Sequence, residues 1–272
     1  MLFLPECFGF MSDATHKTLD HAEALDDGNA TTANNNNVIF KSLQSIAQDY
    51  ELWISGGGIH EANAPPVVST DLDDDNEHEH IKPRVYNTHI ILNYKGELVS
   101  KYRKAHLFDV SIPSKGVNLK ESATTAPGNN GIVVTSSPLG MLGLSICYDL
   151  RFPEQYTMLT ERGAQILLVP SAFTVPTGEA HWHALLRARA IENQCYVIAA
   201  AQCGVHNVKR KSYGHSLVVD PWGRIIVDAG GSGSDDDDDE VKVVMCDLDL
   251  SLVESVRGRM PIAQHRRDAT LM

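Results

Sequence analysis

The chain has 272 residues, of which 43% are hydrophobic, and this is enough apolar material for a sizeable buried core. Its formal net charge of −12 at pH 7 argues against nucleic acid and anionic membranes as partners, because an acidic surface attracts neither. The sequence contains no apolar stretch long enough to span a bilayer. Five cysteines without a C-x-x-C spacing indicate reduced thiols in a reducing compartment, which favours the cytoplasm.

Strand and helix signals alternate along the chain and predict a mixed α/β fold. A helix is predicted from Val38 to Tyr50, where Ile39, Leu43, Ile46, Ala47 and Tyr50 share one face. A second helix is predicted from Gly178 to Asn193, with Trp182, Leu185 and Leu186 on its apolar face. Strands are predicted at 1–5, 51–59, 85–94, 97–104, 132–147, 165–170, 195–203, 213–220, 223–228 and 241–247.

Tight hairpin turns are predicted at 93–96 and 221–223, because glycine accepts a positive φ there. Hairpins mixed with crossover helices exclude a purely parallel sheet. We predict a single domain over 1–272, since no linker rich in proline and serine divides the chain. Three low-complexity tracts, near 31–37, 70–80 and 230–240, cannot bury a face and are predicted to be solvated loop insertions.

The segment around Cys147 has the pattern of a strand that presents a nucleophile. An apolar run stops at this thiol, and Phe152-Pro153-Glu154 can then open a helix, because proline is favoured at a first helical position. A buried core cysteine is the plain alternative, since free cysteines are often buried. Two further strand ends carry chemistry of their own. Leu2 to Glu6 ends in a carboxylate, and the segment 99–108 brings lysines to the end of a third strand.

A carboxylate, an ammonium and a thiol are the groups that amide hydrolysis through a thioester requires. The thiol needs a base to become a thiolate, and Glu6 can be that base. A carboxylate beside a thiol raises the thiol pKa, so a cation is needed to offset it and to stabilise the oxyanion. Lys104 suits both demands. The backbone N–H of Tyr148, directly after Cys147, is the natural second oxyanion donor.

These segments resemble the carbon-nitrogen hydrolases of the nitrilase superfamily, which use a Glu-Lys-Cys triad. The matching segments are 4–6, 102–108 and 146–154, in the family's order, and the resemblance continues through 170–173, 181–182, 187–193, 213–216, 220–223 and 265–267. Within the superfamily the chain looks most like the branch of deaminated glutathione amidases. The resemblance implies that Glu121 is the family's second glutamate, which orients the lysine or the substrate.

The resemblance also implies a four-layer α-β-β-α sandwich that dimerises to eight layers. Helices after Cys147 and from Glu179 to Asn193 would pack across the two-fold axis of a homodimer, where Arg187 and Arg189 pair with Glu192 or cross the interface. Family members begin with a strand and a helix before the catalytic glutamate, whereas Met1 here lies close to Glu6. We therefore expect the N-terminus to be incomplete, with an exposed sheet edge, and mitochondrial targeting stays open.

The predicted activity is hydrolysis of a linear, non-peptide amide, a small-molecule substrate, without a cofactor. The resemblance implies deaminated glutathione, cleaved to 2-oxoglutarate and Cys-Gly. The alternatives are an ω-amidase that acts on 2-oxoglutaramate and a catalytically silent scaffold with a retained hydrolase fold. Substrate contacts are expected from Phe173, Thr174, Lys209 and Lys211, because the basic run at 209–211 can attract a carboxylate-bearing substrate.

No metal site is predicted. The histidines His181, His183, His206 and His215 lack the i, i+4 helical spacing of a metalloprotease, which favours structural hydrogen bonding. The tract at 71–80 is rich in Asp and His but lacks the spaced ligands and central glycine of a calcium loop. A serine hydrolase is set aside, because no G-x-S-x-G elbow surrounds Ser216.

Overall fold

The computed structural model describes residues 1–25, 37–73, 76–112, 117–208, 210–231 and 241–267. The described strands form a four-stranded sheet of order β1-β2-β3-β4, a six-stranded sheet of order β14-β13-β10-β9-β8-β7, and two short hairpins, β5-β6 and β11-β12. Their bounds are β1 (Leu2–Glu6), β2 (Ile54–Asp73), β3 (Asn76–Leu92), β4 (Leu98–Arg103), β5 (Asp109–Ile112), β6 (Val117–Lys120), β7 (Val134–Ser137), β8 (Gly140–Leu144), β9 (Ile166–Leu168), β10 (Tyr196–Ala199), β11 (Cys203–Asn207), β12 (Arg210–Tyr213), β13 (Leu217–Val219) and β14 (Ile225–Asp228).

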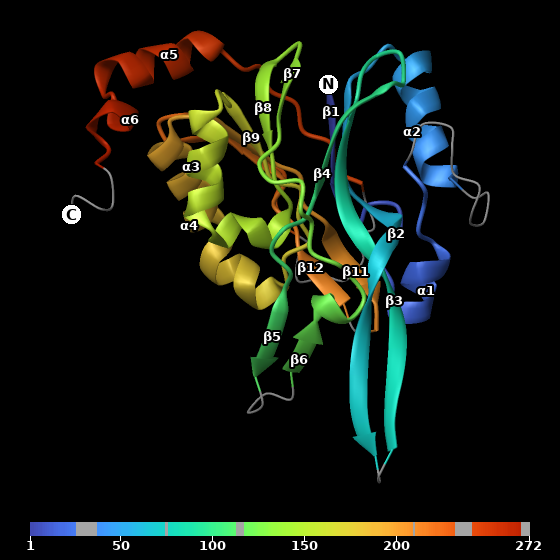
Figure 1. Ribbon diagram of the computed structural model, residues 1–272. Coiled ribbons are helices and arrows are strands. Elements are labelled where there is room, and N and C mark those ends of the chain that lie inside the picture. Colours follow the sequence, from blue (N-terminus) through green and yellow to red (C-terminus); the bar gives the residue numbers. More distant parts are fainter. Residues whose placement is uncertain (26–36, 74–75, 113–116, 209, 232–240, 268–272) are drawn as a thin grey trace.

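The helices cover the outer faces of the two large sheets (Figure 1). Helices α1 and α2 lie on the four-stranded sheet, and α3 and α4 lie on the six-stranded sheet. The helices are α1 (Thr15–Asp20), α2 (Val38–Asp49), α3 (Pro153–Glu161), α4 (Val175–Asn193), α5 (Leu250–Arg259) and α6 (Ile262–His265), with 3-10 helices η2 (Glu121–Ala123) and η3 (Cys147–Arg151). This arrangement is the predicted four-layer α-β-β-α sandwich. None of the described helices combines the length and the apolar character that crossing a bilayer requires.

Both large sheets mix parallel and antiparallel pairs, as the hairpin turns predicted. β1 runs parallel to β2, and β8, β9 and β10 run parallel to one another, while the other ladders of these sheets are antiparallel. The largest hydrophobic cluster joins the six-stranded sheet to α3, α4 and the inner face of the other sheet, through Ile91 and Tyr102. Apolar burial from both sheets therefore fixes how the strand ends of one sheet face those of the other.

The two predicted helices form, with one difference in the buried face. In α4, Trp182 and Leu186 are fully buried, as the spacing predicted. In α2, the buried residues are Phe40, Leu43 and Ala47, whereas Ile46 is 37% and Tyr50 is 70% exposed. The buried face of α2 is therefore rotated about the helix axis relative to the predicted face. The apolar spacing alone did not distinguish Phe40 from its neighbours, and the tilt of α2 on the sheet decides which apolar residue faces inward.

The structure contradicts two of the strand predictions, at 132–147 and at 241–247. The predicted strand 132–147 is a hairpin of β7 and β8, and the chain reverses before Gly140, whose φ of 115° few side chains tolerate. The predicted strand 241–247 has no regular structure, and its Val241 and Met245 are 88% and 89% exposed. A strand requires a partner edge, and within the described residues no strand pairs with 241–247.

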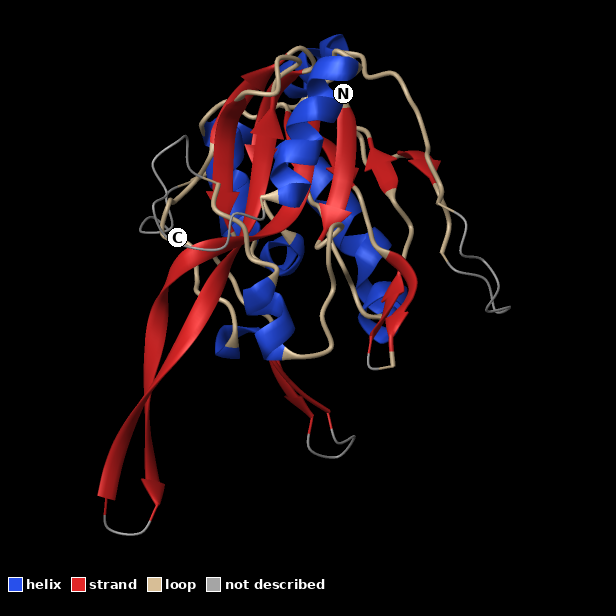
Figure 2. Ribbon diagram, turned by 90° about the vertical axis from the view of Figure 1, so that its right-hand side faces the viewer, coloured by secondary structure: helices blue, strands red, loops and turns tan. Residues whose placement is uncertain are grey.

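The tract at 70–80 was wrongly predicted to be a loop. The strands β2 and β3 run through most of it and pair with each other to Asp73 and Asn76, so that the hairpin extends beyond the sandwich (Figure 2). An antiparallel ladder satisfies the backbone whether or not a face is buried, so burial-based reasoning misses it. The tracts at 31–37 and 230–240 lie almost wholly outside the described residues. The single domain over 1–272 stays a prediction.

Candidate active site

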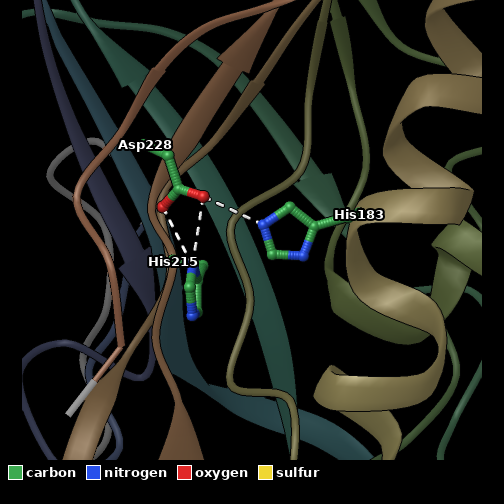
Figure 3. Close-up of side chains that lie close together, drawn as sticks. All are labelled: His183, His215 and Asp228. Atoms are coloured by element: carbon green, nitrogen blue, oxygen red, sulfur yellow. Dashed lines mark hydrogen bonds and ion pairs between the residues drawn. The ribbon is translucent and has the colours of Figure 1, made fainter. Parts of the chain in front are cut away.

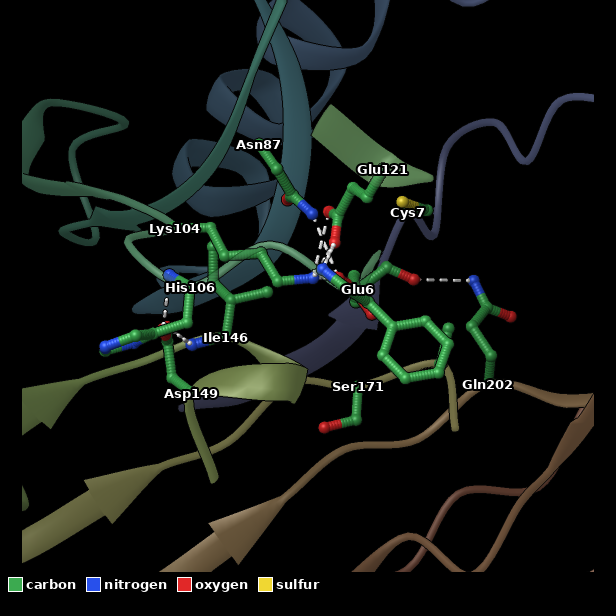
Figure 4. A network of polar contacts seen from close by, with 12 residues as sticks. Glu6, Cys7, Asn87, Lys104, His106, Glu121, Ile146, Asp149, Ser171 and Gln202 are labelled. Carbon is green, nitrogen blue, oxygen red and sulfur yellow. Dashed lines mark hydrogen bonds and ion pairs between the residues drawn. The ribbon is translucent and has the colours of Figure 1, made fainter. Parts of the chain in front are cut away.

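Three strand ends converge on one pocket, as their sequence patterns predicted. Glu6 is the last residue of β1, Lys104 directly follows β4, and Cys147 opens η3 shortly after β8. All three line a pocket of about 270 Å³, together with Glu121 and Tyr148. Figure 4 shows Lys104 pointing between Glu6 and Glu121 at the centre of a polar network.

Lys104 holds the two glutamates together. Its Nζ donates to Glu6 Oε1 at 2.9 Å and to both Oε1 and Oε2 of Glu121 at 3.0 Å. Asn87 Nδ2 donates to the same Glu6 oxygen at 2.9 Å, and the N–H of Phe108 donates to Glu121 Oε2 at 2.7 Å. Because Asn87 and the N–H of Phe108 hold the two carboxylates that accept from Lys104, the Lys104 ammonium has little freedom to leave the pocket.

The pairing of β1 with β2 sets the place of Glu6. In that register Glu6 lies opposite Gly58, and Asn87 reaches across from β3. A Cβ at Gly58 would come within 2.6 Å of Asn87 Oδ1 and 3.3 Å of the Glu6 side chain. Only glycine therefore lets the carboxylate and the amide meet behind the pocket.

Cys147 has a strained backbone that its surroundings hold in place. Its φ is 46°, in the left-handed region, and its N–H donates to the carbonyl of Pro170 at 2.9 Å. The buried carboxylate of Asp149 accepts from the N–H of Ile146 at 2.9 Å, the hydroxyl of Tyr102 at 2.8 Å and the N–H of His106 at 3.0 Å. Strain maintained by such a network is typical of functional sites, where it presents a side chain that a relaxed strand would turn away.

The charges in the pocket favour an ionised glutamate beside a protonated thiol. Burial raises the pKa of Glu6, but the Lys104 ammonium and its hydrogen bond outweigh burial, so the Glu6 pKa lies below its usual value. Burial lowers the pKa of Lys104, yet Glu121 and Glu6 together hold it well above its usual value. Burial and the Glu6 carboxylate raise the pKa of the Cys147 thiol, and Lys104 only partly offsets them. The resting pocket thus holds a base next to the proton that it can remove.

Of the four residues expected to contact the substrate, two line the pocket, one does not, and one lies outside the described residues. Phe173 and Thr174 line the pocket. Lys209 lies outside the described residues. Lys211 is exposed on β12 and is not among the residues that line the pocket, because successive side chains of a strand point to opposite faces. The residue between them, Arg210, lines the pocket instead.

Arg210 and Asn87 are among the pocket residues that the sequence reasoning missed. Arg210 Nη2 donates to the carbonyl of Ala172 at 2.9 Å, and its buried Nε has no hydrogen-bond partner within the described residues. The basic run at 209–211 was the signal for it, but strand alternation is needed to choose the residue. The sequence around Asn87 did not indicate a contact with Glu6, because this contact depends on the pairing of β3 with β2.

The four histidines make the hydrogen bonds that their spacing favoured. His181 Nδ1 lies 3.3 Å from Arg151 Nη2, and His206 Nε2 lies 2.9 Å from the hydroxyl of Ser212. His183 and His215 both contact Asp228. All four histidines therefore make hydrogen bonds within the described residues.

Comparison with known proteins shows the family to which the chain belongs. The carbon-nitrogen hydrolase family model matches residues 1–258. A deaminated glutathione amidase of Dictyostelium discoideum is 46% identical over 266 residues, which make up 97% of this chain and 81% of that protein. The crystal structure of the C. elegans NitFhit protein has a TM-score of 0.77 and 38% identity, and the match covers 98% of this chain and 57% of that one.

A second solved structure extends the comparison. Nit3 of Saccharomyces cerevisiae, a member of branch 10 of the nitrilase superfamily, has a TM-score of 0.75 and 30% identity over 98% of this chain and 83% of that one. The family match includes β1, β4 and η3, whose ends meet in the pocket. This chain therefore belongs to the carbon-nitrogen hydrolase family and is a hydrolase of non-peptide carbon-nitrogen bonds in linear amides.

Proposed function

We propose that Cys147 is the nucleophile of this amidase and that Glu6 is its general base. When a substrate carbonyl lies over the thiol, Glu6 takes the thiol proton and the sulfur forms a bond to the carbonyl carbon. The proposal is supported by the place of the Glu6 carboxylate beside the Cys147 thiol, where the pKa of Glu6 lies below and the pKa of Cys147 above its usual value. Substrate binding displaces water from the pocket and strengthens this proton transfer.

Lys104 and the N–H of Tyr148 stabilise the oxyanion in this proposal. The ammonium of Lys104 is 2% exposed and is held by three carboxylate oxygens, so its charge is fixed before the reaction begins. Tyr148 is the second residue of η3, where the first amides of a helix have no partner inside the helix. Glu121 acts as a positioning residue, because both of its carboxylate oxygens accept hydrogen bonds from Lys104.

The reaction is completed by release of the amine and hydrolysis of the thioester by water. The tetrahedral intermediate collapses, the carbon-nitrogen bond breaks, and the proton on Glu6 passes to the leaving amine. Water then enters, gives a proton to Glu6 and attacks the thioester carbon. The carbon-sulfur bond breaks and the thiolate regains its proton, so that the enzyme returns to its resting state.

The proposed substrate is deaminated glutathione, cleaved to 2-oxoglutarate and Cys-Gly. Arg210 lines the pocket that holds Cys147, and its buried Nε has no hydrogen-bond partner within the described residues, which supports an acyl part that carries a carboxylate. Deaminated glutathione and 2-oxoglutaramate share this acyl part. A guanidinium binds a carboxylate through paired hydrogen bonds, and the acyl part of this substrate ends in a carboxylate. The name of the Dictyostelium relative supports the same substrate.

A substrate comparison tests the proposal. The purified protein is assayed with deaminated glutathione, 2-oxoglutaramate and an uncharged amide, and the acyl adduct on Cys147 is sought by mass spectrometry. We expect the highest kcat/KM with deaminated glutathione. A higher value with 2-oxoglutaramate would identify an ω-amidase, and a folded protein that forms no adduct with any of the three would identify a scaffold.

Arg210→Gln separates substrate recognition from chemistry. We expect KM for deaminated glutathione to rise at least about tenfold, since a charge-assisted hydrogen bond contributes about 1.5–3 kcal/mol. Turnover of the uncharged amide changes much less. Lys211→Gln is the matched control, because this neighbouring side chain is exposed outside the pocket. Equal losses for the charged and uncharged amides would contradict a carboxylate contact.

We further propose that the chain forms a homodimer through α3 and α4. Two apolar side chains on these helices, Met158 and Ile191, are 43% and 42% exposed, which fits a surface that packs against a second copy. Of the two alternatives predicted for Arg189, the structure has the pairing with Glu192, at 3.0 Å, and the buried guanidinium also donates to the carbonyl of Leu150 within the same chain. Ile191→Lys is expected to give monomers in light scattering, and a retained dimer would contradict this surface.

A reducing compartment remains our proposal for the location of the enzyme, with the cytoplasm preferred over the mitochondrion. All five cysteines of the chain are free thiols in the structure. Fractionation of the cells that express the protein tests this location, and recovery only from an oxidising compartment would contradict it.

A further inference from the structure

A second cluster of polar side chains lies outside the active pocket. His183 Nε2 is 2.9 Å from Asp228 Oδ2, and His215 Nδ1 is 3.0 Å from Asp228 Oδ1 and 3.1 Å from Oδ2. Figure 3 shows both imidazoles pointing at the one carboxylate. One ligand atom from each residue lies within 4.8 Å of the others, and none of the three lines the pocket that holds Cys147.

The three side chains come from elements that are distant in sequence. His183 is on α4, His215 lies between β12 and β13, and Asp228 is the last residue of β14. His215 has a φ of 59°, a left-handed conformation that a non-glycine residue rarely takes without a constraint. This backbone turns its ring toward Asp228. The cluster thus connects the helix that covers the six-stranded sheet with the edge of that sheet.

We propose that His183, His215 and Asp228 bind a divalent transition-metal ion of the Zn²⁺ class. Two imidazoles and a carboxylate are ligands that zinc accepts, with water in a fourth position. For bonds of about 2.0–2.2 Å in tetrahedral geometry, ligand atoms lie roughly 3.3–3.5 Å apart. The N–O distances here are 2.9–3.1 Å and all the ligand atoms lie within 4.8 Å of one another, so binding of the ion requires the two rings to shift by a small distance relative to Asp228 and to each other.

The proton balance of binding is simple. Each neutral imidazole keeps one ring proton and presents a lone pair on the other nitrogen. His183 binds through Nε2 and keeps its proton on Nδ1, while His215 binds through Nδ1 and keeps its proton on Nε2. The ion then takes the place of the hydrogen bonds that His183 and His215 make to Asp228.

The surroundings of the cluster hold the ligands in place and leave room for an ion to enter. The N–H of Gly230 donates to Asp228 Oδ1 at 2.8 Å, and the ring of Tyr213 stacks on His215 with centroids 4.5 Å apart. Such contacts around a ligand fix its orientation. The side chains of His183, His215 and Asp228 are 32%, 24% and 27% exposed, so the ion and its water can reach them from solvent.

The position of the cluster predicts a structural role for the ion. Trp182, next to His183 on α4, donates from its indole nitrogen to the carbonyl of His215 at 2.9 Å and packs on Phe173, which lines the pocket. A bound ion adds a second link between α4 and the loop that carries His215. It stabilises the folded chain without taking part in amide hydrolysis.

Metal titration of the full chain tests this proposal. The protein carries Cys147→Ala to remove the pocket thiol, is freed of metal with a chelator, and is titrated with Zn²⁺ by calorimetry and with Co²⁺ by absorption spectroscopy. We expect about one equivalent to bind and to raise Tm, because the ion binds only the folded state. The Co²⁺ spectrum should show tetrahedral visible bands and no sulfur-to-metal charge transfer.

Asp228→Asn is the decisive variant. Asn keeps an oxygen that accepts the histidine N–H groups but loses the charge that the ion requires, so affinity should fall at least about tenfold. His183→Gln should weaken binding similarly and serves if Asp228→Asn does not fold. His181→Ala on the same helix is the control and should bind like the parent. Unchanged affinity in both ligand variants, charge transfer that accounts for all bound Co²⁺, or no binding by the parent at micromolar metal would overturn the proposal.

Discussion

The strand β4 and the residue that follows it bring cations to two buried glutamates, Glu61 and Glu6. On one side Lys101 and Arg103 pair with Glu61 at 3.1 and 2.7 Å. Directly after the strand, Lys104 pairs with Glu6 at 2.9 Å and with Glu121 at 3.0 Å. The pKa of Glu6 and that of Glu61 are both lowered: burial raises each, and the cations and hydrogen bonds more than compensate. Charge and burial alone therefore do not distinguish the two clusters.

The clusters differ in what remains available to a substrate. Both oxygens of Glu61 are occupied, because Arg103 binds them in a fork at 2.7 Å each and the hydroxyl of Thr88 adds a bond at 2.7 Å. The guanidinium also lies 4.1 Å above the ring centroid of Tyr86. Glu6 instead faces a thiol and a pocket. A buried ion pair can take part in chemistry where it borders a cavity and a nucleophilic side chain. Where every oxygen of the carboxylate is already hydrogen-bonded, its role is structural.

The largest effect is expected at the thiol, which only the Glu6 cluster possesses. Cys147→Ala should abolish hydrolysis and change the free energy of unfolding by roughly 1 kcal/mol or less, since only a small side chain is lost. Cys147→Ser should be nearly inactive, because the ionised Glu6 is too weak a base for a hydroxyl. Steady-state assays and chemical denaturation measure both effects. A serine variant within tenfold of wild type would remove Cys147 from the role of nucleophile.

Lys104 is expected to have the next largest effect. Lys104→Ala and Lys104→Arg should both lower kcat by about 10²–10³-fold or more, since each loses a fixed oxyanion donor and the planar guanidinium does not fit the place of the ammonium. Single-turnover kinetics measure the chemical step. If the arginine variant retained most of its activity, Lys104 would be a general charge on the pocket wall.

Glu61→Gln should affect stability and leave catalysis nearly intact. Loss of the carboxylate leaves Arg103 poorly paired and should cost about 1–3 kcal/mol at pH 7. Because the folded pKa of Glu61 lies below its ordinary value of 4.5, its contribution is present above pH 4.5 and is lost as pH falls through the folded pKa. Denaturation of both proteins between pH 7 and pH 3 should therefore converge at low pH. A difference that persists at pH 3 would contradict this ionic origin.

Lys101→Ala should have the smallest effect. The Lys101 side chain is 26% exposed and Glu61 keeps its fork with Arg103, so the expected loss is about 0.2–1 kcal/mol. Activity should be that of wild type, and this variant is the control for Lys104, three positions later on the chain. A large fall in kcat here would mean that the two clusters are coupled.

Local patterns in the sequence were enough to predict several elements and the residue types of the site. The apolar runs ahead of Glu6 and Cys147 and the strand predicted at 97–104 gave three strand ends, and the structure brings Glu6, Lys104 and Cys147 into one pocket. Pro153 predicted the start of α3, where it occupies the first helical position. These signals depend only on neighbouring residues, such as an apolar run that stops or a proline that fixes φ.

The tertiary structure decided whatever depends on a partner distant in sequence. The segment 241–247 has the composition of a strand but no described partner edge, whereas the polar tract at 70–80 is a strand pair because β2 and β3 pair with each other. Asn87, Arg210 and the cluster of His183, His215 and Asp228 meet their neighbours in the same way, through elements that are distant in sequence. A sequence pattern predicts which way a side chain points relative to its own strand or helix, but only packing between elements determines which groups it meets.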